Sequence, residues 1–239
     1  MPYRKQQFAN NEIYHIVLRG LDDNLIFKDI NDYYRGIFSI YEFNNLKPVS
    51  IRERRRIINR LKKTSRGRAS ANLVDMRERL VDILVFCFMP NHMHLLIRQL
   101  KENGVTKFMS KLGTGLGSYL NKKYQRRGYV FQNRFSSVHI KNDEQLKIVF
   151  AYIHTNPLSL VYSKWKKIRI ENLEGVYSFL EVYKWSSYLD YIGIKNFPSI
   201  TERNFILDLM NGNQGCRDFI KYWINYKGEP ESYSNLFLE

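Results

Sequence analysis

The chain has 239 residues, enough for one domain with a substantial core plus an appendage, or for two small domains. Apolar residues make up 44% and aromatic residues 15%, which indicates a packed globule, and no apolar run is long enough to suggest a membrane span. The formal net charge of +15 favours a polyanionic partner such as a nucleic acid, with a merely solvated basic surface as the alternative.

The cellular compartment follows from the N-terminus and the cysteines. Residues 1–7 lack the apolar core of a secretory signal, so we expect a cytoplasmic protein with no membrane partner. Cys87 and Cys216 are too few for a disulfide framework and lack zinc-finger spacing, so we interpret both as reduced thiols outside the chemistry.

The first elements in the chain are a strand and a helix. Residues 13–18 form a β-rich run that a polar turn closes. Asn31 or Asp32 is expected to cap a helix that ends near residue 45. Residues 46–80 form a basic insertion, helical in part, that interrupts the pattern of the core.

Two apolar strands follow, joined by a tight turn. Residues 81–88 are almost wholly apolar, residues 89–91 turn the chain, and residues 92–97 run back as the partner strand of residues 81–88. A second helix is expected over 106–124 and a last strand over 138–140. The order strand, helix, strand, strand, helix, strand predicts an α+β fold, a ferredoxin-like antiparallel sheet (βαββαβ) with helices on one face. The other face would be left to hold a site.

An extra helix is expected after the last strand. It runs from Asn142 to Asn156, and Pro157 ends it. Tyr152 and Asn156 are one turn apart, so they share a face that lies beside the apolar stripe of the helix. These two side chains can therefore face a cleft while the stripe packs against the core.

Two histidines provide the strongest chemical signal. His92 and His94 are one residue apart on a strand, so their side chains project from the same face and can bind one divalent metal ion. With the amide of Asn156 as third ligand, the set mixes nitrogen and oxygen and leaves open positions, which suits Mg²⁺ or Mn²⁺. Such an ion would polarise a phosphoryl group, and Tyr152 would attack phosphorus if a nearby cation or base favoured the phenolate.

Each of these pieces also has a simpler interpretation. A pair of strand histidines can be ordinary packing residues. Tyr152 is one of 17 tyrosines, and an asparagine before a proline ends many helices for local reasons. The combination, rather than any single residue, points to a site.

Several blocks of the chain resemble, in the same order, the HUH single-tyrosine transposases, and most closely the REP-associated tyrosine transposases and their insertion-sequence relatives. The blocks are Tyr14–Gly20, Met89–Leu96, Tyr119–Tyr124, Phe131–Phe135, Tyr152–Pro157 and Trp185–Tyr188. They span about residues 8–190 outside the basic insertion. Residues 158–161 depart from the Val-Arg-Ala-Gly-like stretch that often continues the tyrosine block.

The resemblance implies a nuclease domain over residues 1–160, which includes the basic insertion, and a C-terminal extension over 161–239 that packs on the core or contacts DNA. It implies metal-dependent nicking and rejoining of single-stranded, hairpin-containing DNA through a 5′-phosphotyrosine intermediate. The metal would be Mg²⁺ or Mn²⁺, and the protein a monomer or a homodimer. The residues carried over are Tyr152 as nucleophile and His92, His94 and Asn156 as metal ligands.

Basic side chains of the insertion and of the core are the candidates for contact with DNA. They are Arg19, Arg52, Arg54, Arg55, Arg56, Arg60, Lys62, Lys63, Arg98 and Arg134. Two other functions stay open: a non-catalytic DNA-binding regulator that retains the fold, and a metal-dependent nuclease that cuts with activated water. Tyr119 and Tyr124 are rival nucleophiles, but neither has an amide placed as Asn156 is.

Overall fold

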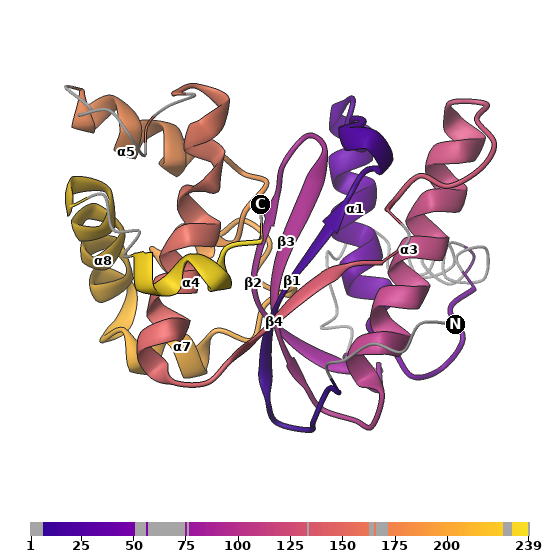
Figure 1. The fold of residues 1–239 in the computed structure, drawn as a ribbon, viewed down its shortest axis with the longest axis horizontal. Coiled ribbons are helices and arrows are strands. Elements are labelled where there is room, and N and C mark those ends of the chain that lie inside the picture. The colour runs from indigo at the N-terminus through magenta and orange to yellow at the C-terminus, as the bar shows by residue number, and fades with distance from the viewer. Residues whose placement is uncertain are drawn as a thin grey trace, which may run out of the picture.

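A four-stranded antiparallel sheet lies at the centre of the molecule, with strand order β2-β3-β1-β4 (Figure 1). The strands are β1 (Ile13–Arg19), β2 (Val81–Phe88), β3 (His92–Gln99) and β4 (Ser136–Ile140). This is a computed structural model, and it describes residues 7–50, 56, 75, 77–132, 134–162, 165, 172–226 and 231–238.

Two helices cover one face of the sheet, as the βαββαβ order predicts. They are α1 (Ile30–Glu42), after the short η1 (Leu21–Asp23), and α3 (Gly104–Lys123). Alternate residues of the strands point to this face and form one buried core with the two helices. Gly115 allows α3 to approach α1, because a Cβ there would lie 2.2 Å from Cζ of Phe43. The α+β, ferredoxin-like prediction is confirmed.

The start of α1 differs from the prediction. Asp29, rather than Asn31 or Asp32, is the N-cap, and its carboxylate accepts hydrogen bonds from the backbone amides of Asn31 and Asp32. Asp32 occupies the third helical position, where its carboxylate accepts from the amide of Asp29 and completes a capping box. The prediction chose residues already inside the helix because three acidic or amide residues compete for the cap.

Helices of the second half of the chain cover the other face of the sheet (Figure 1). They are α4 (Asp143–Thr155), η2 (Asn156–Leu160), α5 (Leu173–Val182), α6 (Tyr188–Tyr191), α7 (Asn204–Leu209), α8 (Gly212–Tyr226) and η3 (Glu231–Leu236). α4 lies against β2 and β3, and α8 packs on the outside of α4. Trp223 of α8 belongs to the same buried core as Leu84 and Leu96 of the sheet. The sheet is therefore enclosed between two layers of helices.

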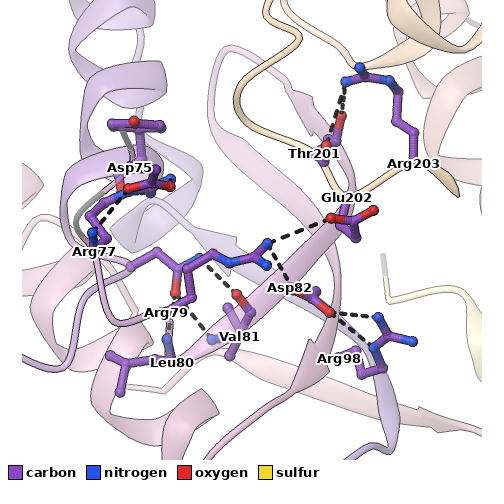
Figure 2. A network of polar contacts seen from close by, with 12 residues as sticks. Asp75, Arg77, Arg79, Leu80, Val81, Asp82, Arg98, Thr201, Glu202 and Arg203 are labelled. Atoms are coloured by element: carbon purple, nitrogen blue, oxygen red, sulfur yellow. Dashed lines mark hydrogen bonds and ion pairs between the residues drawn. The ribbon is translucent and has the colours of Figure 1, made fainter. Parts of the chain in front are cut away.

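A network of ion pairs joins the far end of β2 and β3 to the segment before α7 (Figure 2). The buried carboxylate of Asp82 pairs with Arg98 at 2.6 Å and with Arg79 at 3.0 Å. Arg79 also reaches Glu202 at 3.8 Å, and the backbone amide of Glu202 donates to the carbonyl of Ile83. The network fixes residues of the C-terminal extension to an edge strand of the sheet.

None of the helices in the described ranges is long and apolar enough to cross a membrane.

Candidate metal and tyrosine site

The turn that leads into the two histidines is held by the segment after β1. The carbonyl of Pro90 accepts hydrogen bonds from the amides of Ile26 and Phe27, and the carbonyl of Asn91 accepts from the amide of Gly20. Gly20 is needed for this close approach, because a Cβ there would lie 2.2 Å from the carbonyl oxygen of Asn24. These contacts fix the position at which β3 begins, and with it the position of His92.

The imidazoles of His92 and His94 meet on one face of β3, as the strand alternation predicts. Their Nε2 atoms are 2.9 Å apart. The Nδ1 atom of His92 lies 2.7 Å from the side-chain oxygen of Asn91, which can only accept, so Nδ1 carries the proton. In the neutral form of His92, the lone pair is therefore on Nε2 and points at His94.

Asn156 reaches the same point from the opposite layer. It directly follows α4 and opens η2, where Pro157 stands at a position that needs no amide proton. Its side-chain nitrogen lies 3.2 Å from Nε2 of His94, and the residue is buried. The site thus lies between β3 and the end of α4, with ligands from both.

These three residues fit a divalent ion. Two imidazole lone pairs that face each other at 2.9 Å repel unless a cation lies between them. The separation matches that of adjacent ligands on a six-coordinate ion, which is about 3 Å for bonds near 2.1 Å. Among the described residues no group of three or more His, Cys, Asp or Glu is placed to hold a metal, and Asn156 is the residue beside the two histidines whose amide oxygen could supply a third ligand.

Tyr152 faces the histidines but lies beneath the C-terminal segment. Its ring centroid is 5.7 Å from that of His94, and only 1% of the residue is exposed. The ring of Phe237 stacks on it at 4.4 Å with an interplanar angle of 24°. In Figure 1 the yellow η3 runs beside α4 toward the sheet. Tyr152 lies on the face of α4 that points to the histidines of the sheet. Because it is buried, it does not line the open cleft that the sequence predicts.

His15 is a member of the site that the sequence reasoning missed. It lies on β1, and its Nε2 is 3.0 Å from Nδ1 of His94, while its Nδ1 is 2.9 Å from the carbonyl oxygen of Leu236. Burial lowers the pKa of His15 to about 4, only partly opposed by the hydrogen bond to Leu236, so the ring is neutral near pH 7. The alternation of β1 could have revealed it, because His15 shares a face with Val17, which pairs with His94.

The other candidates for chemistry are used elsewhere in the fold. The hydroxyls of Tyr119 and Tyr124 both donate to the buried carboxylate of Asp32, at 3.3 Å and 2.6 Å, on the α1 and α3 side of the sheet. His154 points away from Tyr152, as expected on a regular helix, and its Nε2 is 2.8 Å from the hydroxyl of Ser187. Burial lowers the pKa of His154 to about 3. Tyr119 and Tyr124 therefore stabilise the packing of the α3 end against α1.

Four of the ten basic residues predicted to contact DNA lie within the described residues. Arg19 ends β1 opposite His92 and pairs with Asp23 at 3.2 Å, and Arg56 and Arg134 are exposed. Arg98 is committed to Asp82, at the other end of β3 from His92. The remaining six lie outside the described residues: Arg52, Arg54, Arg55, Arg60, Lys62 and Lys63.

A cavity of about 600 Å³ opens between α3 and residues 128–132, 134 and 135. Gly113 and Gly117 line the α3 wall, and no atom lies within 4 Å of the position that a Cβ of Gly113 would take. Tyr129, which is 79% exposed, and Arg134 line the opposite wall. Exposed aromatic rings and guanidinium groups are the side chains on which unpaired bases stack.

A family model matches part of the chain. Residues 49–156 match the family model of IS200-like transposases, and this range contains His92, His94, Tyr152 and Asn156. Over these residues the chain is similar to the IS200-like transposases, in agreement with the resemblance of the motifs. The matched range begins within the predicted basic insertion and leaves out β1.

The comparison with solved structures finds a protein described as a REP-associated tyrosine transposase bound to a REP hairpin. The similarity covers 85% of this chain and 96% of that chain, at 12% sequence identity and a TM-score of 0.43. A search of curated proteins finds no match.

Proposed function

We propose that the protein is a metal-dependent strand transferase that nicks and rejoins single-stranded, hairpin-containing DNA through a 5′-phosphotyrosine at Tyr152. The observation that carries the proposal is the convergence of His92, His94, Asn156 and Tyr152 at one point within the range that is similar to the IS200-like transposases. The net charge of +15 supports a polyanionic substrate. The choice of hairpin DNA follows from the family resemblance.

The chemistry divides between the ligands and the tyrosine. His92, His94 and Asn156 would hold Mg²⁺ or Mn²⁺, which when bound polarises the phosphoryl group and balances its negative charge. Tyr152 loses its phenolic proton, and its oxygen forms a bond to phosphorus as the bond from phosphorus to the 3′ oxygen breaks. The departing 3′ oxygen takes up a proton. Because the phosphodiester energy is kept in the tyrosine ester, attack by a 3′-OH rejoins the strand without ATP.

Burial of the site has two consequences for this chemistry. Tyr152 and His94 are almost wholly removed from solvent, which would protect a phosphotyrosine ester from hydrolysis. A DNA strand can reach Tyr152 only after Phe237 leaves its stacked position. We therefore include displacement of the Phe237 ring, with the backbone of Leu236 kept in place, as a step of the proposed cycle.

We also propose that two parts of the chain have different roles. All the proposed catalytic residues lie within residues 1–160, and the described residues of 161–239 form an extension that covers the α4 side of the sheet. The cavity beside Tyr129 and Arg134 is a candidate surface for the unpaired part of the DNA.

The test is incubation of the purified protein with labelled single-stranded hairpin DNAs from its own genomic neighbourhood, with Mn²⁺, Mg²⁺ or EDTA, followed by denaturing electrophoresis. We expect a DNA-linked protein band that EDTA abolishes and that Tyr152→Phe lacks. Tyr119→Phe is the matched control, because that hydroxyl makes a long contact on the far side of the sheet. Cleavage by Tyr152→Phe without an adduct would replace the proposal with a metal-dependent nuclease, and binding without cleavage would replace it with a regulator.

A further inference from the structure

We propose that His15 is a positioning residue that fixes the tautomer of His94, so that the Nε2 lone pair of His94 faces the metal position. The proposal rests on the metal site proposed above. It assigns a role to a histidine that lies on β1, outside the matched transposase range of 49–156.

The first contact is the one between Nδ1 of His15 and the carbonyl oxygen of Leu236. A carbonyl oxygen can only accept a hydrogen bond, so Nδ1 of His15, 2.9 Å away, must carry a proton. Because His15 is fully buried, where a charged imidazolium is strongly disfavoured, its second ring nitrogen, Nε2, is left with a lone pair. The tautomer of His15 is thus set by the backbone of the C-terminal segment.

The contact between His15 and His94 sets the tautomer of His94 in the same way. Nε2 of His15 can only accept, so Nδ1 of His94, 3.0 Å away, must donate. The two rings are inclined by only 20° with centroids 5.3 Å apart, so they meet edge to edge, as an in-plane N–H···N bond requires. The neutral ring of His94 is therefore protonated on Nδ1, which leaves the lone pair on Nε2.

An independent contact leads to the same assignment. Before a metal binds, the side-chain nitrogen of Asn156 donates to Nε2 of His94 at 3.2 Å, so Nε2 is an acceptor; as a metal ligand, Asn156 would turn its amide oxygen to the ion instead. The opposite tautomer of His94 would place two lone pairs 3.0 Å apart between His15 and His94 in a buried site. Both neighbours of the His94 ring thus select the form that can bind a metal.

The sheet, rather than a mobile loop, sets the distance between the two histidines. Val17 of β1 pairs directly with His94 of β3, and His15 is two residues earlier on the same face. His15 itself is not a ligand in this arrangement, because both of its ring nitrogens are already used. Its role is to orient the ligand, as hydrogen-bonded partners of metal-binding histidines do.

The first test needs no variant and no metal. The ¹⁵N chemical shifts of the five histidines are measured by NMR in the metal-free wild type labelled at imidazole nitrogens. We expect His94 to show a protonated Nδ1 and an unprotonated Nε2. A protonated Nε2 on His94 would overturn the proposal regardless of any nuclease activity.

The second test measures Mn²⁺ affinity by calorimetry in matched variants. His15→Phe keeps a ring but removes the acceptor, and we expect binding weaker by about 10- to 100-fold. His15→Gln offers a side-chain oxygen to Nδ1 of His94 and should restore affinity to within a few-fold of the wild type. His154→Phe is the control, because His154 is equally buried but contacts Ser187 rather than His94, and its affinity should match the wild type.

The outcomes separate this proposal from the proposed function. A folded His15→Phe protein with wild-type affinity would refute the role of His15 alone, and so would equal losses in His15→Phe and His15→Gln. A wild-type protein that binds no Mn²⁺ would refute the metal site itself. If His15→Phe fails to fold, the His15→Gln affinity and the wild-type tautomer decide.

Discussion

Substitution of Phe237 by alanine should expose Tyr152. The aromatic pair contributes about 0.5–1.5 kcal/mol beyond its buried area, and the partly buried ring of Phe237 also loses apolar contact with the core. We expect the closed position of the segment to be weakened by about 1–2 kcal/mol. This corresponds to about 5- to 30-fold more frequent exposure of Tyr152.

The exposure can be measured by nitration of tyrosines with tetranitromethane, followed by peptide mass spectrometry. The nitration rate of Tyr152 should rise by that factor in Phe237→Ala. Tyr191 is the internal reference, because it is fully buried, its hydroxyl donates to the carbonyl of Leu84 and its ring packs against that of Phe150. An unchanged rate at Tyr152 would refute the reasoning, and a parallel rise at Tyr191 would show general loosening instead.

The remaining predictions concern stability, thiol reactivity and the metal. Asp32→Asn should lower the free energy of unfolding by about 2 kcal/mol in urea titrations, because Lys123, partly solvated, loses a buried carboxylate partner at 2.6 Å. Burial raises the pKa of both thiols, that of Cys216 to about 12, so Cys87 and Cys216 should react with a thiol reagent at pH 8 only after unfolding. Mn²⁺ at about 100 times its Kd should stabilise the protein by about 2.7 kcal/mol in thermal unfolding, and His94→Ala should abolish the gain.

Patterns within a few residues were sufficient to predict the strands of the sheet and the helix face that Tyr152 and Asn156 share. β2 was predicted with its observed bounds because a short, almost wholly apolar run that is followed by the turn residues Pro90 and Asn91 favours a buried strand over a helix. His92 and His94 were placed on one face by alternation, and Tyr152 with Asn156 by the helical repeat. Each of these inferences needs only neighbours within a few residues.

Contacts between distant segments could not be predicted in this way. The role of His15 depends on the register in which β1 pairs with β3, which no pattern within β1 specifies. The cover over the second face of the sheet depends on which surface receives amphipathic helices such as α8, and the stacking of Phe237 on Tyr152 joins residues 85 positions apart. The sequence reveals that such residues are apolar, but not what they cover.

The hydrogen bond between His15 and Leu236 has a consequence for how the protein is made. Its two residues are 221 positions apart, so His15 leaves the ribosome long before Leu236 does. During synthesis, the strand that carries His15 can pair with β3 long before the segment that supplies the carbonyl of Leu236 exists. A nascent chain would therefore hold the histidines and Tyr152 in an uncovered site until residues 236 and 237 have been synthesised.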